Sequence, residues 1–240
     1  MYVRAYFFFK RVVEYLGYVS SGRAKRKIVV LTFDDYIDAK NIEIAEYLKS
    51  RHIPATFFLT LDQTKPEIIK QLVNMAHEIA GHSLSHSREE REGSYQSAKE
   101  CYKELSKYDG NVVSWRFPWT SRDEQSVENV KNAGFSIDSS VGTFYPVKKL
   151  LDLGTLYEIP WLRLPKQWQM DVNEEDYAII KNYIIKSVES KNGIFVLGFH
   201  TYYQYKKFQE FKDLIEKLVE MEVEFITLRE AFVVLKNGKL

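Results

Sequence analysis

Short apolar runs alternate with amphipathic stretches from Lys27 to the end of the chain, and this alternation limits the folds that the sequence can adopt. Each apolar run has the length of a buried strand, and each amphipathic stretch has the spacing of a surface helix. Alternating strands and helices form a mainly parallel sheet covered by helices. About seven such units favour a barrel over an open sheet. The sequence therefore predicts an α/β fold whose chemistry gathers at the carboxyl ends of the strands.

The individual elements follow from the apolar pattern and from the residues that start and stop helices. Gly134 has the place of a glycine that ends a helix, and Pro66 suits a first helical turn. The segment 142–154 is less regular, and we expect a long loop over the site. Strands are predicted over 27–33, 54–60, 112–117, 135–138, 157–161, 194–200 and 223–227. Helices are predicted over 38–51, 66–79, 94–107, 123–133, 173–190, 205–220 and 228–235.

The composition excludes several classes of protein. A formal net charge of +1 predicts no bulk attraction to nucleic acid. Cys101 is the only cysteine, which excludes a disulfide framework and a thiolate metal cluster. The 240 residues suffice for one large domain, which we place at 27–240. Any transition-metal site must draw on carboxylates and on the five histidines, His52, His77, His82, His86 and His200.

The first 26 residues form a separate segment in our interpretation. Their apolar run is interrupted by Lys10 and Arg11, well short of the roughly 20 apolar residues that span a bilayer. The order of charges also differs from that of a secretory signal. We expect an amphipathic extension packed on the domain, with membrane-surface contact through residues 1–20 as the alternative. The expected location is cytoplasmic, or peripheral at the membrane.

The apolar run from Ile28 to Phe33 ends in two adjacent carboxylates, Asp34 and Asp35. Neighbouring carboxylates repel unless their tasks are separated. A cation on one of them would leave the other free as a base. The alternative is that Asp35 only caps a helix that begins near Asp38.

Two histidines, His82 and His86, stand four residues apart. On a helical turn they would face the same way and could grip one ion. Such a pair alone is more often two ordinary surface residues. With Asp35 it would make a ligand set that leaves open positions for water. His52 and His77 lie on other segments, and we treat them as surface or core residues.

Three further segments place polar residues near predicted strand ends. Pro118 holds Phe117 extended, which can turn the backbone N–H of Trp119 toward a site, although a rigid turn is the simpler explanation. Asp138-Ser139-Ser140 is typical of a helix N-cap or of a loop hydrogen-bonding cluster. His200 ends an apolar run and is as readily a buried core histidine as a catalytic one.

Together these segments resemble the motifs of the polysaccharide deacetylases of the NodB-homology type, carbohydrate esterase family 4. The resemblance runs in the family's motif order from about Lys27 to Thr227, and its first two motifs are the most specific. The five matches are Thr32-Phe33-Asp34-Asp35, His82-Ser83-Leu84-Ser85-His86, Arg116-Phe117-Pro118-Trp119, Asp138 and His200.

The resemblance implies a distorted (β/α) barrel, with seven strands on our count of units, and a role for each matched residue. A divalent metal ion, expected to be zinc with cobalt, nickel or manganese as alternatives, would be held by Asp35, His82 and His86. Asp34 would be the general base, steadied by Arg116. His200 would be the general acid, its pKa raised by Asp138. We expect Trp119, Leu197 and Tyr202 to contact the substrate.

The sequence departs from the family at three places. Trp119 stands where tyrosine is usual, and the tryptophan usual after the fourth-motif aspartate is missing after Asp138. Gly198 replaces a leucine that lines the acetyl pocket in the family, so Trp161 or Trp168 would have to fill the space.

The main functional hypothesis is hydrolysis of the N-acetyl group of an amino sugar or glycan, with an N-acetylated carbohydrate as the partner. One alternative is hydrolysis of another carbon–nitrogen amide bond, as in allantoinase-like relatives, which the altered acetyl pocket favours. The other alternative is a glycan-binding relative without turnover, since fold does not fix function.

Overall fold

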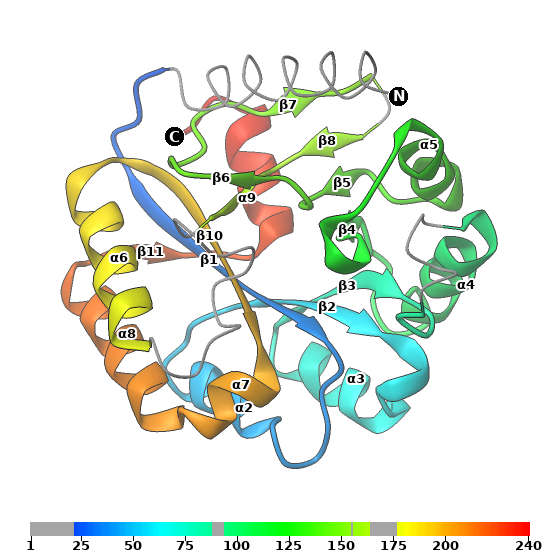
Figure 1. Ribbon diagram of the computed structural model, residues 1–240, viewed down its shortest axis with the longest axis horizontal. Coiled ribbons are helices and arrows are strands. Elements are labelled where there is room, and N and C mark those ends of the chain that lie inside the picture. Colours follow the sequence, from blue (N-terminus) through cyan, green and yellow to red (C-terminus); the bar gives the residue numbers. More distant parts are fainter. Residues whose placement is uncertain (1–21, 88–93, 155, 164–176) are drawn as a thin grey trace.

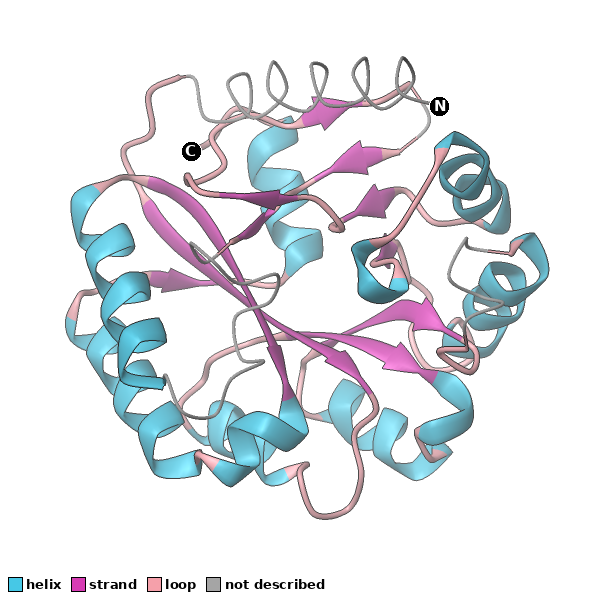
Figure 2. Ribbon diagram, viewed as in Figure 1, coloured by secondary structure: helices cyan, strands magenta, loops and turns pink. Residues whose placement is uncertain are grey.

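The computed structural model describes residues 22–87, 94–154, 156–163 and 177–240. Their main feature is a curled sheet with helices around its outer side (Figures 1 and 2). The predicted N-terminal extension, 1–26, lies for its first 21 residues outside the described residues, as does Trp168. Among the described residues, no helix has the length and apolar character needed to cross a bilayer.

Seven consecutive strands of the sheet run parallel, as the alternation of elements predicts. In spatial order they are β10 (Gly193–His200), β1 (Lys27–Asp35), β2 (Thr56–Thr60), β3 (Glu78–Ser83), β4 (Ser114–Trp115), β5 (Ile137–Asp138) and β8 (Tyr157–Glu158). Parallel pairing brings their carboxyl ends to one edge. The predicted distorted barrel is therefore confirmed.

The sheet is larger than the seven strands predicted. An antiparallel strand, β7 (Leu151–Asp152), extends it beyond β8, and β11 (Glu224–Phe225) pairs with the first part of β1. A separate parallel pair joins β6 (Gly142–Thr143) to β9 (Trp161–Leu162). The predicted loop 142–154 therefore contains two short strands. Two-residue strands are too short to leave an apolar run in the sequence, and they form only by pairing with a neighbouring strand.

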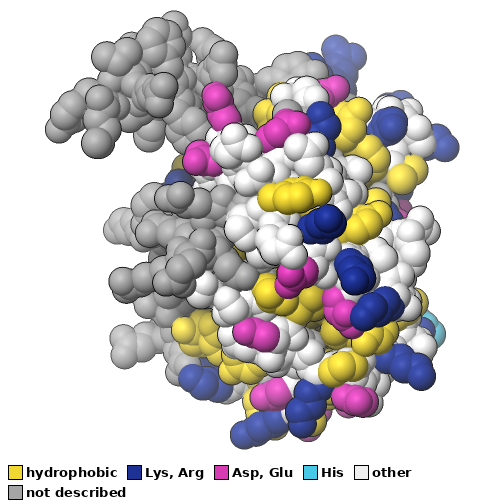
Figure 3. Space-filling view, turned by 90° about the vertical axis from the view of Figure 1, so that its right-hand side faces the viewer, with side chains coloured by type: hydrophobic (Ala, Val, Ile, Leu, Met, Phe, Trp, Pro, Cys, Tyr) yellow, Lys and Arg dark blue, Asp and Glu magenta, His cyan; other side chains and the backbone are white. Residues whose placement is uncertain are grey.

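Eight described helices cover the sheet. In chain order they are α2 (Glu43–Ser50), α3 (Pro66–Asn74), α4 (Tyr95–Leu105), α5 (Glu124–Ala133), α6 (Tyr177–Ser190), α7 (Thr201–Lys206), α8 (Phe208–Glu220) and α9 (Leu228–Lys236). Asp123 caps α5 in a reciprocal capping box, and Gly134 ends it at φ 122°. On the face shown in Figure 3, Lys and Arg alternate with Asp and Glu, in keeping with the near-zero net charge.

The predicted helix over 66–79 is the main error in the element assignment. Helix α3 ends at Asn74, and the chain then forms β3, which is buried along its whole length. The run Glu78-Ile79-Ala80-Gly81 contains one β-branched residue, so its local preference for a strand is weak. Parallel pairing with β2 makes it a strand.

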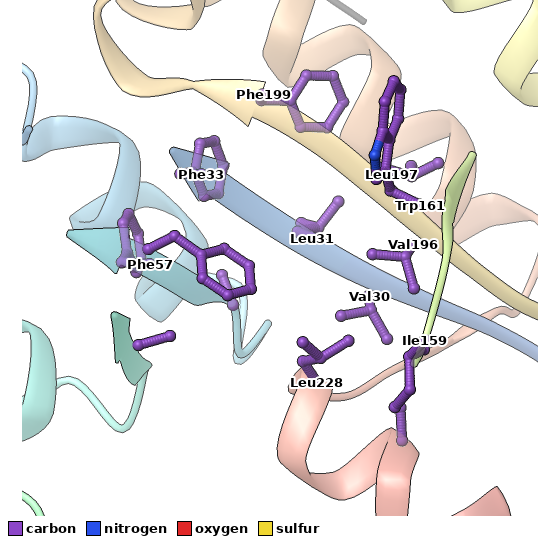
Figure 4. Packing of buried hydrophobic residues seen from close by; sticks show 14 of the residues in the cluster. Val30, Leu31, Phe33, Phe57, Ile159, Trp161, Val196, Leu197, Phe199 and Leu228 are labelled. Atoms are coloured by element: carbon purple, nitrogen blue, oxygen red, sulfur yellow. The ribbon is translucent and has the colours of Figure 1, made fainter. Parts of the chain in front are cut away.

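Aromatic rings fill the space between the central strands and α8. Phe33 stacks on Phe57 with ring centroids 5.0 Å apart and lies 5.9 Å from Phe199 (Figure 4). Phe211 of α8 closes this cluster at 6.1 Å from Phe33. Strand β1 is buried on both faces, as expected for a central parallel strand.

His77 is a core residue with both ring nitrogens occupied. Its Nδ1 accepts a hydrogen bond from the Ala55 N–H at 3.2 Å, and Nε2 lies 3.0 Å from the Ala45 carbonyl oxygen, to which it donates. The ring is therefore neutral, and burial lowers the pKa of His77 to about 4.

This burial predicts a loss of stability at mildly acidic pH. The unfolded chain protonates His77 near 6.5, whereas the folded protein does so only near 4, so stability falls as the pH decreases between these values. The contribution is at most about 3 kcal/mol. Urea unfolding of His77→Gln, which keeps one donor and one acceptor, should show a weaker pH dependence than the wild type. The same change at exposed His52 should leave the pH dependence as it is.

Candidate metal centre

The residues expected at the site lie at the carboxyl ends of neighbouring strands. Asp34 and Asp35 end β1, His82 lies near the end of β3, and His200 ends β10. The register of β1 and β10 places Asp34 directly opposite His200. The parallel arrangement therefore gathers residues from distant parts of the chain at one edge of the sheet.

The Asp35 carboxylate is the centre of this group. Its Oδ1 lies 3.3 Å from His82 Nε2 and 3.2 Å from His86 Nε2. One ligand atom from each of the three residues lies within 4.8 Å of the others. The structure thus brings together the three residues predicted to hold a metal ion.

The way in which the two histidines converge differs from the prediction. They do not share a helical turn: His82 is inside β3, and His86 follows the strand in a left-handed conformation with φ 55°. The turn of the chain after Ser83 brings the ring centroids to 5.2 Å. The four-residue spacing between His82 and His86 therefore covers the end of a strand and the turn that follows it.

His82 is held so that one nitrogen faces Asp35. Its Nδ1 lies 2.8 Å from the Arg116 carbonyl oxygen. A carbonyl oxygen only accepts hydrogen bonds, so Nδ1 carries the proton and the Nε2 lone pair points to the site. The His86 ring packs against Trp119, with centroids 4.3 Å apart.

The charge states of this group suit cation binding. Burial acts to raise the pKa of Asp35, but the three neighbouring imidazoles lower it, and the net pKa is below its usual value. Burial and the adjacent His82 lower the pKa of His86. An ionised carboxylate next to neutral imidazoles is the ligand form that divalent metal ions require.

One atom of Asp35 indicates that a ligand belongs in the site. Its Oδ1 is buried and accepts no hydrogen bond from the described residues, although two imidazole nitrogens face it. A buried carboxylate oxygen left in this way is costly. A cation shared by the three donor atoms removes that cost, so the residues present fit a divalent metal ion.

Asp34 has a different partner, Arg116. The Arg116 Nη1 donates to Asp34 Oδ1 at 2.7 Å and to the Thr32 hydroxyl at 2.8 Å. Its Nε donates to the Ser139 carbonyl at 2.6 Å, and Nη2 donates to the Ser139 hydroxyl at 2.9 Å. The guanidinium also lies over the Phe58 ring at 4.3 Å. Arg116 is 1% exposed, so Asp34 is held in one orientation.

His200 and Tyr202 approach Asp35 from the side opposite to its Oδ1. Both His200 Nε2 and the Tyr202 hydroxyl lie 3.5 Å from Asp35 Oδ2. Tyr202 stacks on Tyr36 with ring centroids 5.7 Å apart. Across the site, Trp119 is 44% exposed beside His86. Aromatic rings therefore border the site on two sides.

That Leu197 contacts the substrate stays a prediction. Leu197 is fully buried, and it lies an odd number of residues from His200, so its side chain points to the other face of β10. Gly198 shares the face of His200. A β-carbon at Gly198 would lie 3.6 Å from Arg116 Nη1 and 3.8 Å from the Thr32 hydroxyl, so a methyl group would fit there in ordinary van der Waals contact.

Asp138 has partners other than the expected His200. It pairs with Arg122 and accepts a hydrogen bond from the Ser140 hydroxyl at 2.5 Å. The expected pairing of Asp138 with His200 stays a prediction. The loop hydrogen-bonding cluster predicted for residues 138–140 is confirmed. Arg122 and Glu158 belong to no motif, and no pattern in the sequence predicts a role for either.

Left-handed backbone conformations gather around the site. Trp119 and Thr120 have φ values of 51° and 55°, next to those of Asp35 at 76° and His86 at 55°. Such conformations cost free energy in residues other than glycine and occur often at functional sites.

The first half of the chain matches a family model. Residues 21–137 match the model described as polysaccharide deacetylase. A peptidoglycan-N-acetylglucosamine deacetylase from Bacillus cereus is 38% identical over 77 residues, which are 31% of this chain and 28% of that protein. The chain thus spans less than a third of the length of this relative.

Solved structures extend the similarity of the fold to most of the chain. A polysaccharide deacetylase from Bacillus cereus superimposes with a TM-score of 0.59 at 21% identity, covering 84% of this chain and 92% of that one. A family 4 acetyl xylan esterase from Clostridium thermocellum, in complex with a cobalt ion, gives 0.59 at 20% identity, covering 87% and 91%. The resemblance stated from the motifs is confirmed.

The geometry predicts which residues govern metal affinity. We expect His82→Ala to weaken binding of Zn²⁺ or Co²⁺ by about 100-fold or more, because it removes one of three donors. Isothermal titration calorimetry of metal-free protein measures this, with exposed His52→Ala as the control. Equal affinity in the wild type and in His82→Ala would contradict the assigned site.

Proposed function

We propose that the chain is a metal-dependent hydrolase, because its residues 21–137 match the model of the polysaccharide deacetylase family. The proposed reaction removes the N-acetyl group from an N-acetylated amino sugar or glycan. The observation that carries the proposal is that the two carboxylates at the end of β1 have different partners. Asp35 faces two imidazoles, while the adjacent Asp34 is bound by Arg116 and is not among the three ligands.

In this proposal, the cation is held by Asp35, His82 and His86. Once bound, a divalent ion would supply Lewis-acid chemistry, polarising the amide carbonyl and lowering the pKa of the attacking water. Zinc is the ion we propose, and cobalt, nickel and manganese also suit this donor set.

Asp34 is the proposed general base. Arg116 fixes its carboxylate through Oδ1, so the group can receive the proton of the attacking water without reorienting. The guanidinium is itself fixed by Thr32 and Ser139, which supports a positioning role.

His200 is the proposed general acid. Its Nε2 lies 3.5 Å from Asp35 Oδ2, and it stands opposite Asp34 across the strand pair. A proton on Nε2 could pass to the amine as it leaves. The proposed base and acid thus come from adjacent strands, at the same level of the sheet.

The aromatic residues around the site favour a sugar as the substrate. Trp119 lies on one side, and Tyr36 with Tyr202 lies on the other. Such rings offer flat apolar faces with polar edges, which suit the faces of sugar rings. We propose N-acetylglucosamine units of a glycan as the first class to test, with the backbone N–H of Trp119 stabilising the oxyanion.

Gly198 favours a second candidate reaction, the hydrolysis of a different carbon–nitrogen amide bond. Its missing side chain leaves space beside Arg116 and Thr32. A cyclic amide or ureide such as allantoin is bulkier than an acetamide and would use that space. Acetate release from N-acetylated sugars would favour the main proposal over this candidate.

The general base provides the sharpest test. We expect Asp34→Asn to lower kcat by about 1,000-fold, since the amide cannot accept the proton, while metal affinity stays within about threefold of the wild type. The assay incubates zinc-loaded protein with N-acetylglucosamine oligomers, cell-wall glycan and allantoin, and it follows acetate and amine release. Asp213→Asn on the exposed surface of α8 is the matched control.

Two results would count against the proposal. One is a wild-type protein that binds zinc but converts none of these substrates, which would instead support a glycan-binding protein without turnover. The other is an Asp34→Asn variant with wild-type turnover.

A further inference from the structure

A buried ion cluster lies next to the proposed site and has no role in the reaction described above. Arg122 Nη1 contacts Asp138 Oδ2 and lies 3.0 Å from Glu158 Oε2. Both carboxylates are 0% exposed, and the Arg122 side chain is 13% exposed. Charged groups are rarely buried so completely unless they are paired with one another.

The strand register brings the two carboxylates together. Asp138 and Glu158 are direct partners on the parallel strands β5 and β8. Burial and the neighbouring Asp138 raise the pKa of Glu158 well above its usual value. The Arg122 guanidinium faces both carboxylates of the pair. Glu158 also accepts the Val141 N–H at 3.0 Å, which fixes the chain just after Ser140.

The loop between β4 and α5 is attached to this cluster at both ends. At its start, the Phe117 N–H donates to the Ser140 hydroxyl at 2.9 Å, and Ser140 donates to Asp138. At its end stands Arg122, next to Asp123, which caps α5. Between these anchors lies Trp119, with its left-handed backbone and its contact to His86.

The segment 138–140 also holds Arg116, the residue that orients the general base. Ser139 lies between Asp138 and Ser140 and binds the Arg116 guanidinium through its carbonyl and its hydroxyl. The Ser139 hydroxyl donates in turn to the Ile159 carbonyl at 2.8 Å, beside Glu158. A shift of residues 138–140 would therefore move Arg116, and with it Asp34.

We propose that Arg122 and Glu158 are positioning residues for the hydrolytic reaction. They lock the segment 138–140, which holds Arg116 against Asp34 on one side and the Trp119 loop against His86 on the other. This inference rests on the proposed function. It assigns a role to two residues that no motif marks.

The test compares three variants with the wild type in the zinc-loaded protein. Arg122→Met removes the charge and keeps the aliphatic stem. Ser140→Ala cuts the connection between Asp138 and Phe117 and is too small a change to prevent folding. Lys131→Met, on the exposed side of α5, is the matched control. We expect the first two to lower kcat by about 10-fold to 100-fold with zinc affinity unchanged, and the control to match the wild type.

Two further measurements separate positioning from general stability. Arg122→Lys restores the charge and should recover most of the lost kcat, whereas a role in packing alone would not respond to charge. Hydrogen exchange of the Phe117 amide, followed by NMR, should accelerate about 10-fold or more in Arg122→Met and Ser140→Ala but not in Lys131→Met.

The outcomes distinguish this inference from the proposed function. Wild-type kcat and Phe117 exchange in both Arg122→Met and Ser140→Ala would overturn the inference while leaving the hydrolase intact. If the wild type converts no substrate, the proposed function fails. The exchange of the Phe117 amide then still decides whether Arg122 holds this loop in place.

Discussion

The site depends on the separation of two adjacent carboxylates at the end of β1. Asp34 and Asp35 would repel each other if they faced the same surroundings. The strand directs Asp34 to a buried arginine, and the left-handed turn at Asp35 sends the next carboxylate to the imidazoles. Each negative charge thus has its own positive or cation-binding partner. Arg116 joins the two halves, because its carbonyl orients His82 while its guanidinium holds Asp34.

The parts of this arrangement that could be predicted are those written in local sequence. The apolar run before Asp34 predicts a buried strand with a polar end, and Asp123 with Gly134 marks the limits of α5. The strand β3 was missed because its residues have little preference for a strand and acquire it by pairing with β2. The sequence therefore predicts correctly that His82 and His86 converge, but it predicts a helical turn where the structure has the end of a strand and a turn.

Other parts depend on partners distant in the sequence. Leu197 and Gly198 are neighbours, and only the register of β10 against β1 decides which of them faces the site. Asp138 pairs with the guanidinium of Arg122, and Arg122 lies in no motif that would predict this contact. Parallel pairing of β5 with β8 places Glu158 beside Asp138, and a two-residue strand leaves no pattern from which this could be read.

The pairing of β1 has a consequence for the solubility of the chain. One edge of β1 is shared by two strands: β11 covers Ile28 and Val29, and β2 covers the part from Thr32 onward. A chain shortened before β11 would leave one edge of two fully buried apolar residues unpaired, because β10 pairs only with their other edge. Such an edge invites strand addition from another molecule. By pairing with β1, β11 thus protects that edge from association with other molecules.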